Sequence, residues 1–185
     1  MKIIPLHNKQ KGLIKRASAQ NREAQQELFV EFSPKMLGVC RQYVKDMHLA
    51  EELMLSGFLK VFTKLDTFKH QGSFEGWIRR IMVNTCISYL RKKNRLQLTD
   101  QEYVFDVAAT ESLENTAVED IQKLIDTLPN GYKMVFNLYA IEGFKHSEIA
   151  KELGISVGTS KSQLSKARKW LQENYTKMNN TSYGK

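Results

Sequence analysis

Apolar side chains recur every three or four residues along most of this chain, the spacing that places them on one face of a helix. The first long run of this kind covers residues 22–46. Its apolar face consists of Leu28, Phe29, Phe32, Met36, Leu37, Cys40 and Tyr43. Ser33 and Pro34 interrupt the run. Because proline removes a backbone donor from a helix, we expect the helix to break or restart at this point.

The same periodicity predicts helices over residues 49–66 and about 73–95. The apolar face of the first of these is formed by Leu53, Phe58, Phe62 and Leu65. Alternating patterns typical of strands are scarce along the chain. The expected fold class is therefore all-α.

The sign of the charge changes abruptly after the third predicted helix. Residues 78–95 carry six Arg and Lys residues and no acid, whereas residues 96–120 carry seven acids and no Lys or Arg. The acidic stretch also has little periodic apolar content, so we expect it to be a flexible, partly disordered linker. The polar end of the chain is expected to be disordered as well. The predicted division is a helical domain at 11–95, the acidic linker at 96–117, a second helical domain at 118–175 and a disordered tail at 176–185.

The segment FKHSEIAKELGISVGTSKSQLSKARKWL, residues 144–171, has the pattern of a helix-turn-helix. Gly154 suits the left-handed residue that ends the first helix, and Ser156 suits the N-cap of the second. The outer face of the second helix carries small hydroxyl residues between cations, a combination suited to the major groove of DNA. An ordinary amphipathic helix hairpin with a solvated basic face is the alternative. The candidate DNA contacts are Thr159, Lys161, Ser162, Ser165, Lys166 and Arg168.

The composition of the chain indicates which class of partner it binds. The net charge of +8 and the pI of about 9.4 favour a polyanion such as nucleic acid. Cys40 and Cys86 are far apart in sequence, so we expect two buried thiols in a reducing compartment. The histidines lack the spacing of metal ligands, and no metal or cofactor is expected. The N-terminal residues lack the apolar core of a signal peptide, and no stretch of about 18 apolar residues occurs. We therefore expect a cytoplasmic protein without membrane insertion.

Three motifs follow one another along the chain: AEELMLSGFLKVFTKLDTF at 50–68, GSFEGWIRRIMVNTCISYLRKKNR at 72–95 and EIAKELGISVGTSKS at 148–162. Together they resemble bacterial RNA polymerase sigma factors of the extracytoplasmic-function (ECF) type. The first motif is similar to the helix that binds core RNA polymerase. The second is similar to the segment that melts and reads the minus-ten promoter element, and the third to the helix that reads the minus-thirty-five element.

The resemblance also implies roles for individual residues. The polymerase-binding residues would be Glu51, Glu52, Leu55, Ser56 and Leu59. The minus-ten contacts would be Lys69, His70, Gln71, Ser73, Arg80, Asn84 and Arg91. The loop at 68–74 would receive a base rotated out of the duplex, an extrusion that costs a few kcal/mol. Trp77 occupies the family's tryptophan position and is expected in the core, and the acidic linker would thread into the RNA exit channel of the polymerase.

The chain departs from the family pattern at a few positions. Leu55 and Ser56 stand where the family usually has a glutamine followed by an acid, which leaves the details of polymerase binding open. Ser88 stands where an aspartate is usual. Ser160 replaces a buried valine and Lys145 a capping serine, and we expect both changes to lower local stability.

These observations predict a sigma factor without catalytic residues of its own. It would bind core RNA polymerase and promoter DNA, direct transcription initiation and help to melt the duplex, and an anti-sigma factor is a candidate further partner. Two alternatives remain open at this stage. One is a stand-alone helix-turn-helix regulator that binds operators as a dimer, and the other is a sigma-like interaction module that has lost promoter opening.

Overall fold

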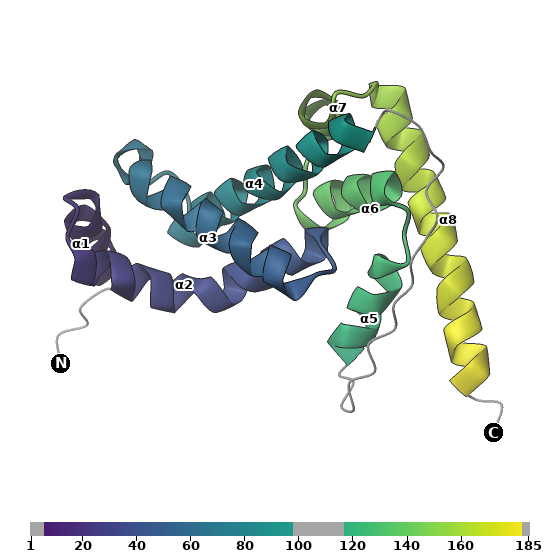
Figure 1. Ribbon diagram of the computed structural model, residues 1–185, viewed down its shortest axis with the longest axis horizontal. Helices are drawn as coiled ribbons and strands as arrows, with labels where there is room; N and C mark the ends of the chain where they lie inside the picture. The colour runs from purple at the N-terminus through teal and green to yellow at the C-terminus, as the bar shows by residue number, and fades with distance from the viewer. Residues whose placement is uncertain (1–5, 98–116, 183–185) are drawn as a thin grey trace. The chain divides into compact units, whose positions relative to one another are not determined.

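A computed structural model describes residues 6–97 and 117–182 of the chain. All regular elements in these two ranges are helical (Figure 1). The chain divides into two compact units between Leu90 and Arg91. None of the helices described there is long and apolar enough to cross a membrane. The elements are α1 (Leu6–Ser18), α2 (Arg22–Tyr43), α3 (Met47–Thr63), the short 3-10 turn η1 (Leu65–Thr67), α4 (Phe74–Gln97), α5 (Ala117–Asp126), α6 (Asn130–Phe136), the π-helical turn η2 (Asn137–Ile141), α7 (His146–Leu153) and α8 (Val157–Ser182).

The first unit packs α1, α2, α3 and most of α4 around one apolar core. The predicted faces are the buried ones, since Leu28, Phe32 and Met36 of α2 are each at most 3% exposed. Phe29 of α2 meets Phe58 of α3 edge to face, with 4.8 Å between ring centroids. Burial of these faces is what stabilises the unit, because an isolated helix of this length is marginal in water.

The helix α2 runs through Pro34 without a break, so the predicted interruption is wrong. Leu28 and Phe32 before the proline and Met36 after it lie on the same buried face. A proline inside a helix costs about 3 kcal/mol, whereas each fully buried large apolar side chain contributes about 1.5–3 kcal/mol. Continuing the buried face past Pro34 therefore outweighs the lost hydrogen bond.

The helices α3 and α4 approach closely at Gly57. A Cβ atom added to this glycine would lie 2.1 Å from Sδ of Met82, which is fully buried in α4. Two polar bridges join α4 to its neighbours: Lys35 of α2 pairs with Glu75 at 2.8 Å, and Lys60 of α3 donates to Thr85 Oγ1 at 3.0 Å. This packing fixes the orientation of α4, and with it the exposed face that α4 presents.

The second unit contains α5 to α8. Ile125, Leu128 and Ala167 form a buried cluster to which α5 and α8 both contribute. An ion pair is also buried there: Lys133 of α6 and Asp126 of α5 are 5% and 8% exposed, and Gln122 adds a hydrogen bond to the Asp126 carboxylate. A charged pair in a core requires such extra partners, because both ions have lost their water.

The start of the first domain and the tail differ from the predicted ones. The first helix begins at Leu6, before the predicted domain start at residue 11. The predicted linker falls mostly on residues 98–116, which lie outside the described residues. The helix α8 continues to Ser182, through residues assigned in the sequence to a disordered tail. Residues 176–182 contain neither glycine nor proline, so nothing in them stops a helix once it has formed.

Candidate nucleic-acid interface

The second helix of the helix-turn-helix is held in place from its first turn. Gly154 ends α7 with a φ of 68°, and the Ser156 hydroxyl accepts the backbone N–H of Thr159 at 2.9 Å, as the sequence predicts for a C-cap and an N-cap. Leu164 and Ala167 lie on the buried side of α8. The opposite side of the helix carries exposed residues with small or cationic side chains. We call this set the reading face: Lys161, Ser162, Ser165 and Lys166.

Three of the predicted minus-thirty-five residues also make contacts within the protein. Thr159 is half-buried, and its hydroxyl lies 2.8 Å from that of Ser156. The Ser162 hydroxyl donates to the Thr159 carbonyl at 3.0 Å. The Arg168 guanidinium lies 5.7 Å from the centre of the Tyr139 ring, on the flank of α8. These contacts favour Lys161, Ser165 and Lys166 as the side chains that can reorient toward a base edge.

The sequence did not predict the side-chain contact that joins α8 to α7. Ser160 is fully buried, and its hydroxyl lies 2.9 Å from Nδ1 of His146 at the start of α7. The imidazole of His146 in turn stacks on Tyr139, with centroids 4.6 Å apart. A serine at this buried position is therefore matched by a polar partner on α7. At Lys145 the other half of a capping box is present, because the Glu148 carboxylate accepts the Lys145 N–H at 2.8 Å.

The predicted minus-ten residues of α4 share one exposed face. Arg80, Asn84 and Arg91 follow one another at helical spacing, and all three are exposed. Ser88 lies between Asn84 and Arg91 on the same face, and its hydroxyl donates to the Asn84 carbonyl at 2.7 Å. The set Arg80, Asn84, Ser88 and Arg91 is called the α4 stripe. An amide between cations can meet both the bases and the phosphates of a DNA strand.

The other predicted minus-ten residues lie on the loop before α4. Lys69, His70, Gln71 and Ser73 are exposed, whereas Phe68 is buried. The Ser73 hydroxyl accepts the Gly76 N–H at 3.0 Å, so Ser73 caps α4. Below the loop, Trp77 is half-buried and stacks on Phe74, with centroids 5.7 Å apart. Trp77 therefore supports the loop as part of an aromatic cluster.

The predicted polymerase-binding residues share the outer side of α3. Glu51, Glu52 and Ser56 are exposed. Leu55 and Leu59 are adjacent on the helix, one turn apart, and are 50% and 69% exposed. Two neighbouring leucines left in water, beside acids, suit a partner protein that covers them.

Cys40 and Cys86 are both buried, and the fold brings their side chains together from α2 and α4. The hydrogen bond with Cys40 and burial raise the pKa of the Cys86 thiol, while the same bond lowers the pKa of Cys40. The pair belongs to the core of the first unit.

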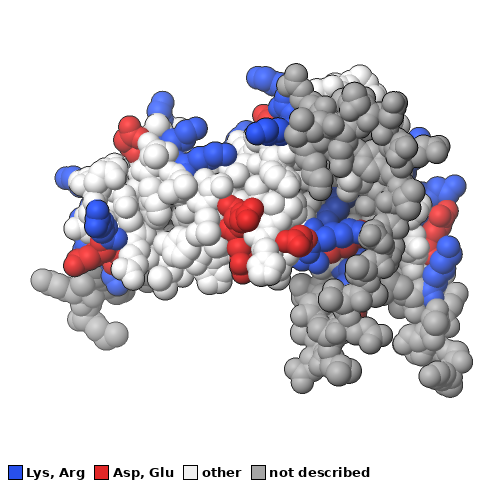
Figure 2. All heavy atoms as spheres, viewed as in Figure 1, with Lys and Arg blue, Asp and Glu red and all other residues white. Residues whose placement is uncertain are grey.

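Charge on the face drawn in Figure 2 is gathered in separate groups, with Lys and Arg side chains interrupted by acids and by wide uncharged areas. Among the coloured residues of this face, the basic groups therefore suit several local anion contacts.

Comparison with known proteins identifies the family. The family described as Sigma-70 region 2 matches residues 28–96, and Sigma-70, region 4 matches residues 118–171. ECF RNA polymerase sigma factor SigW of Bacillus subtilis is 27% identical over 183 residues, which cover 87% of this chain and 96% of that protein. The chain belongs to the ECF sigma factors.

A second relative of this sigma factor is matched over less of its own length. ECF RNA polymerase sigma factor SigE of Mycolicibacterium smegmatis is 25% identical over 154 residues, and the match spans 80% of this chain but 60% of that protein. Among solved structures, the sigma factor RpoE from Bartonella quintana, in complex with the anti-sigma factor NepR, is similar with a TM-score of 0.54. It is 25% identical, and the match covers 80% of this chain and 94% of that one. The two matched regions contain the α4 stripe and the reading face.

Proposed function

We propose that this sigma factor grips promoter DNA at two places, with the α4 stripe and the adjoining loop at the minus-ten element and with the reading face at the minus-thirty-five element. The observation that carries the proposal is that two exposed polar and basic surfaces occur on separate helices, α4 and α8, each within its own segment matched by a sigma-factor family. A single helix-turn-helix would supply only one of them.

At the minus-thirty-five element, the reading face enters the major groove. Lysine can donate to guanine O6 and N7, and serine hydroxyls can donate or accept on any base edge. Arg168 lies on the flank, beside Tyr139, where a guanidinium suits a phosphate. Thr159 contributes at the start of α8, where backbone N–H groups also favour an anion.

At the minus-ten element, Asn84 addresses an exposed base edge while Arg80 and Arg91 hold neighbouring phosphates. The loop residues Lys69, His70 and Gln71 receive the extruded base. Their contacts must offset the few kcal/mol that extrusion costs. Together, these contacts to bases and phosphates stabilise single-stranded DNA, which is what promoter melting requires.

The exposed side of α3 binds the polymerase in this proposal. Leu55 and Leu59 provide an apolar contact, and Glu51, Glu52 and Ser56 surround it. Apolar residues flanked by charge are the common composition of a protein interface. Polymerisation itself belongs to the polymerase, and since both partners are the polymerase and DNA, we place the protein in the cytoplasm.

Reconstituted transcription tests the proposal. Purified core RNA polymerase from the source organism is incubated with this protein and a pool of genomic fragments, and the transcripts are sequenced. Promoter-specific transcripts that depend on the protein are expected. If the protein instead binds DNA tightly alone and yields no specific transcript with core enzyme, a stand-alone regulator is the better account.

A matched pair of variants separates the polymerase contact from the fold. Leu59→Ser removes the more exposed leucine and should weaken binding to core enzyme without loss of helix content. Val30→Ser is the control, because Val30 is 64% exposed on α2 and is similarly accessible. Equal effects of both variants would contradict the assignment to α3.

A further inference from the structure

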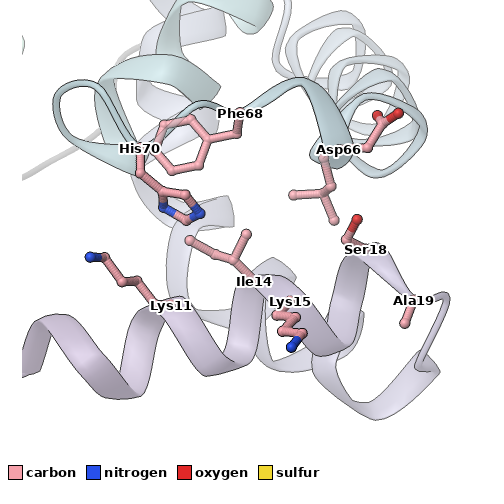
Figure 3. A pocket seen from close by; sticks show the side chains of 9 residues that line it. Lys11, Ile14, Lys15, Ser18, Ala19, Asp66, Phe68 and His70 are labelled. Atoms are coloured by element: carbon pink, nitrogen blue, oxygen red, sulfur yellow. The ribbon is translucent and has the colours of Figure 1, made fainter.

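A groove of about 480 Å³ lies in the first unit between α1 and the segment that leads from α3 to α4 (Figure 3). Lys11 and Ile14 line it from α1, and Phe68 and His70 face them. Since His70 is one of the loop residues placed at the minus-ten element, this groove adjoins the proposed minus-ten site. A separate feature lies in the second unit, where a chain of side-chain contacts leaves α8 and returns to it.

The contacts begin at Ser160, which is fully buried on α8. Its hydroxyl lies 2.9 Å from Nδ1 of His146. The imidazole stacks on the Tyr139 ring, with centroids 4.6 Å apart and 22° between the ring planes. The Arg168 guanidinium lies over the same tyrosine ring, 5.7 Å from its centre. Because Ser160 and Arg168 are both on α8, the contacts return to this helix about two turns further along.

Tyr139 is the central residue of this arrangement. It lies in the π-helical turn η2, outside both helices of the helix-turn-helix, and it is 36% exposed. Turns of this type are rare and frequently occur at functional sites. The ring is held by its stack on His146, whereas Arg168 is an exposed side chain with many rotamers. The contact therefore restricts the arginine more than it restricts the tyrosine.

Arg168 lies at the edge of the reading face. It follows Lys161 by about two turns, so both side chains project from the same side of α8. A guanidinium on this side suits a phosphate beside the groove that the reading face enters. A contact that holds the guanidinium there raises the fraction of the protein that is ready to bind, and the apparent affinity rises with that fraction.

We infer that Tyr139 positions Arg168 for a phosphate of the minus-thirty-five element, and that it acts on DNA through the arginine rather than by a contact of its own. The inference rests on the proposed function and deepens it, because Tyr139 is not among the residues assigned to DNA. His146 and Ser160 anchor the ring to the two helices of the helix-turn-helix. Tyr139 is thus a positioning residue, and His146 is its support.

The surroundings of Tyr139 favour this indirect role over stacking on a base. Two side chains, His146 and Arg168, already lie against its ring. Proteins that stack bases on aromatic residues need an open ring face. With only 36% of the residue exposed, little of the ring remains for a base.

Binding of a duplex promoter fragment to the holoenzyme tests the inference. Holoenzyme is assembled from core polymerase and the full chain, and it is titrated with a fragment that the wild type transcribes. Tyr139→Leu removes the ring and should weaken binding about two- to fivefold, as expected for a cation–π contact at an exposed position. Tyr139→Phe retains the ring and should bind like the wild type. Arg168→Ala should lower the magnitude of the salt slope by about 0.9, the value for one phosphate of duplex DNA.

The combined variant Tyr139→Leu with Arg168→Ala shows whether the ring acts through the arginine. A positioning residue has nothing left to position in this background, so the combined variant should bind no more weakly than Arg168→Ala alone. A merely structural role would lower the affinity by the same factor in both backgrounds. Helix content is measured for each variant, and if Tyr139→Leu lowers it, Tyr139→Met with its adaptable side chain is used in both backgrounds.

Tyr175→Leu is the matched control. Tyr175 is 57% exposed on α8, about two turns beyond Arg168. The control loses an aromatic ring from the second unit but leaves the contact between Tyr139 and Arg168 intact. It should bind the promoter fragment with the wild-type affinity and salt slope.

Each other outcome overturns the inference. Wild-type affinity of Tyr139→Leu, or a further loss when it is combined with Arg168→Ala, shows that the ring does not act through the arginine. Weak binding by Tyr139→Phe shows that the hydroxyl is needed, and an unchanged salt slope of Arg168→Ala removes the phosphate contact. An equal loss in Tyr175→Leu shows a general effect of losing a ring. All of these results leave promoter recognition in place, whereas a wild-type holoenzyme that recognises no promoter removes the proposed function as well.

Discussion

Ser160 and His146 join the two helices of the helix-turn-helix by a hydrogen bond between side chains, 2.9 Å long and placed at a fully buried position of α8. Ser160→Ala removes this bond and leaves a ring nitrogen of His146 without its partner. A net loss of about 1 kcal/mol in the free energy of unfolding is expected, measured by urea denaturation. Ser165→Ala is the control, since it gives α8 the same gain in helix propensity at an exposed position. A Ser160→Ala protein as stable as this control would contradict the role of the bond.

The two cysteines make a prediction about reactivity. Both side chains are fully buried, and the hydrogen bond with Cys40 and burial keep the pKa of Cys86 raised, so Cys86 stays protonated as the pH rises through the neutral range. Neither thiol should be alkylated by iodoacetamide in the folded protein between about pH 7 and 9, and both should react in denaturant. Mass spectrometry of the labelled protein measures this. Rapid labelling of Cys86 in the folded protein would show that the first unit opens easily.

At the scale of elements, the crossing of α3 and α4 depends on Gly57. Gly57→Ala gains about 1 kcal/mol of helix propensity, but the new methyl group meets Met82 in the core, and overpacking costs about 1–3 kcal/mol. We expect a net destabilisation of about 1 kcal/mol, measured by thermal or urea unfolding. Met82→Leu should relieve it, so the double variant should be more stable than the sum of the single changes.

Gly38 provides the matched control for this change. It lies in the interior of α2, is exposed, and has no atom within 4 Å of an added Cβ. Gly38→Ala should therefore stabilise the protein by up to about 1 kcal/mol. If both alanine variants were equally stabilising, the result would contradict the claim that α3 and α4 are too close at Gly57 to accept a methyl group.

Periodicity predicted the helices but not their partners. It indicated which face of α2 or α8 is buried, because that face repeats along the sequence. It carried no information about which residue of another helix meets it. The pairs Gly57–Met82, Ser160–His146 and Asp126–Lys133 are examples, each made by residues on different helices.

Local signals also failed where tertiary packing opposed them. Pro34 is a strong helix breaker in isolation, yet α2 continues through it because its buried face does. The candidate site residues of the loop, the α4 stripe and the reading face could be named from motifs, since these motifs are contiguous in sequence.

At the scale of the whole molecule, the two units divide the work of promoter recognition. In the proposed assignment, the first unit carries the polymerase-binding side of α3, the loop, and Arg80, Asn84 and Ser88 of the α4 stripe, and the second carries the reading face. Each unit has its own buried core, so a change on one DNA-binding surface should leave the other intact. This independence is what the central claim of two DNA contacts requires.

The most direct test is a footprint of the holoenzyme on one promoter, combined with permanganate detection of unpaired thymines. Wild type should protect the minus-thirty-five region and make the minus-ten region reactive. Lys161→Ala with Lys166→Ala should lose the upstream protection first, whereas Arg80→Ala with Asn84→Ala should keep it and lose the permanganate signal. Loss of both signals in each variant, or of neither, would contradict the assignment of one DNA contact to each unit.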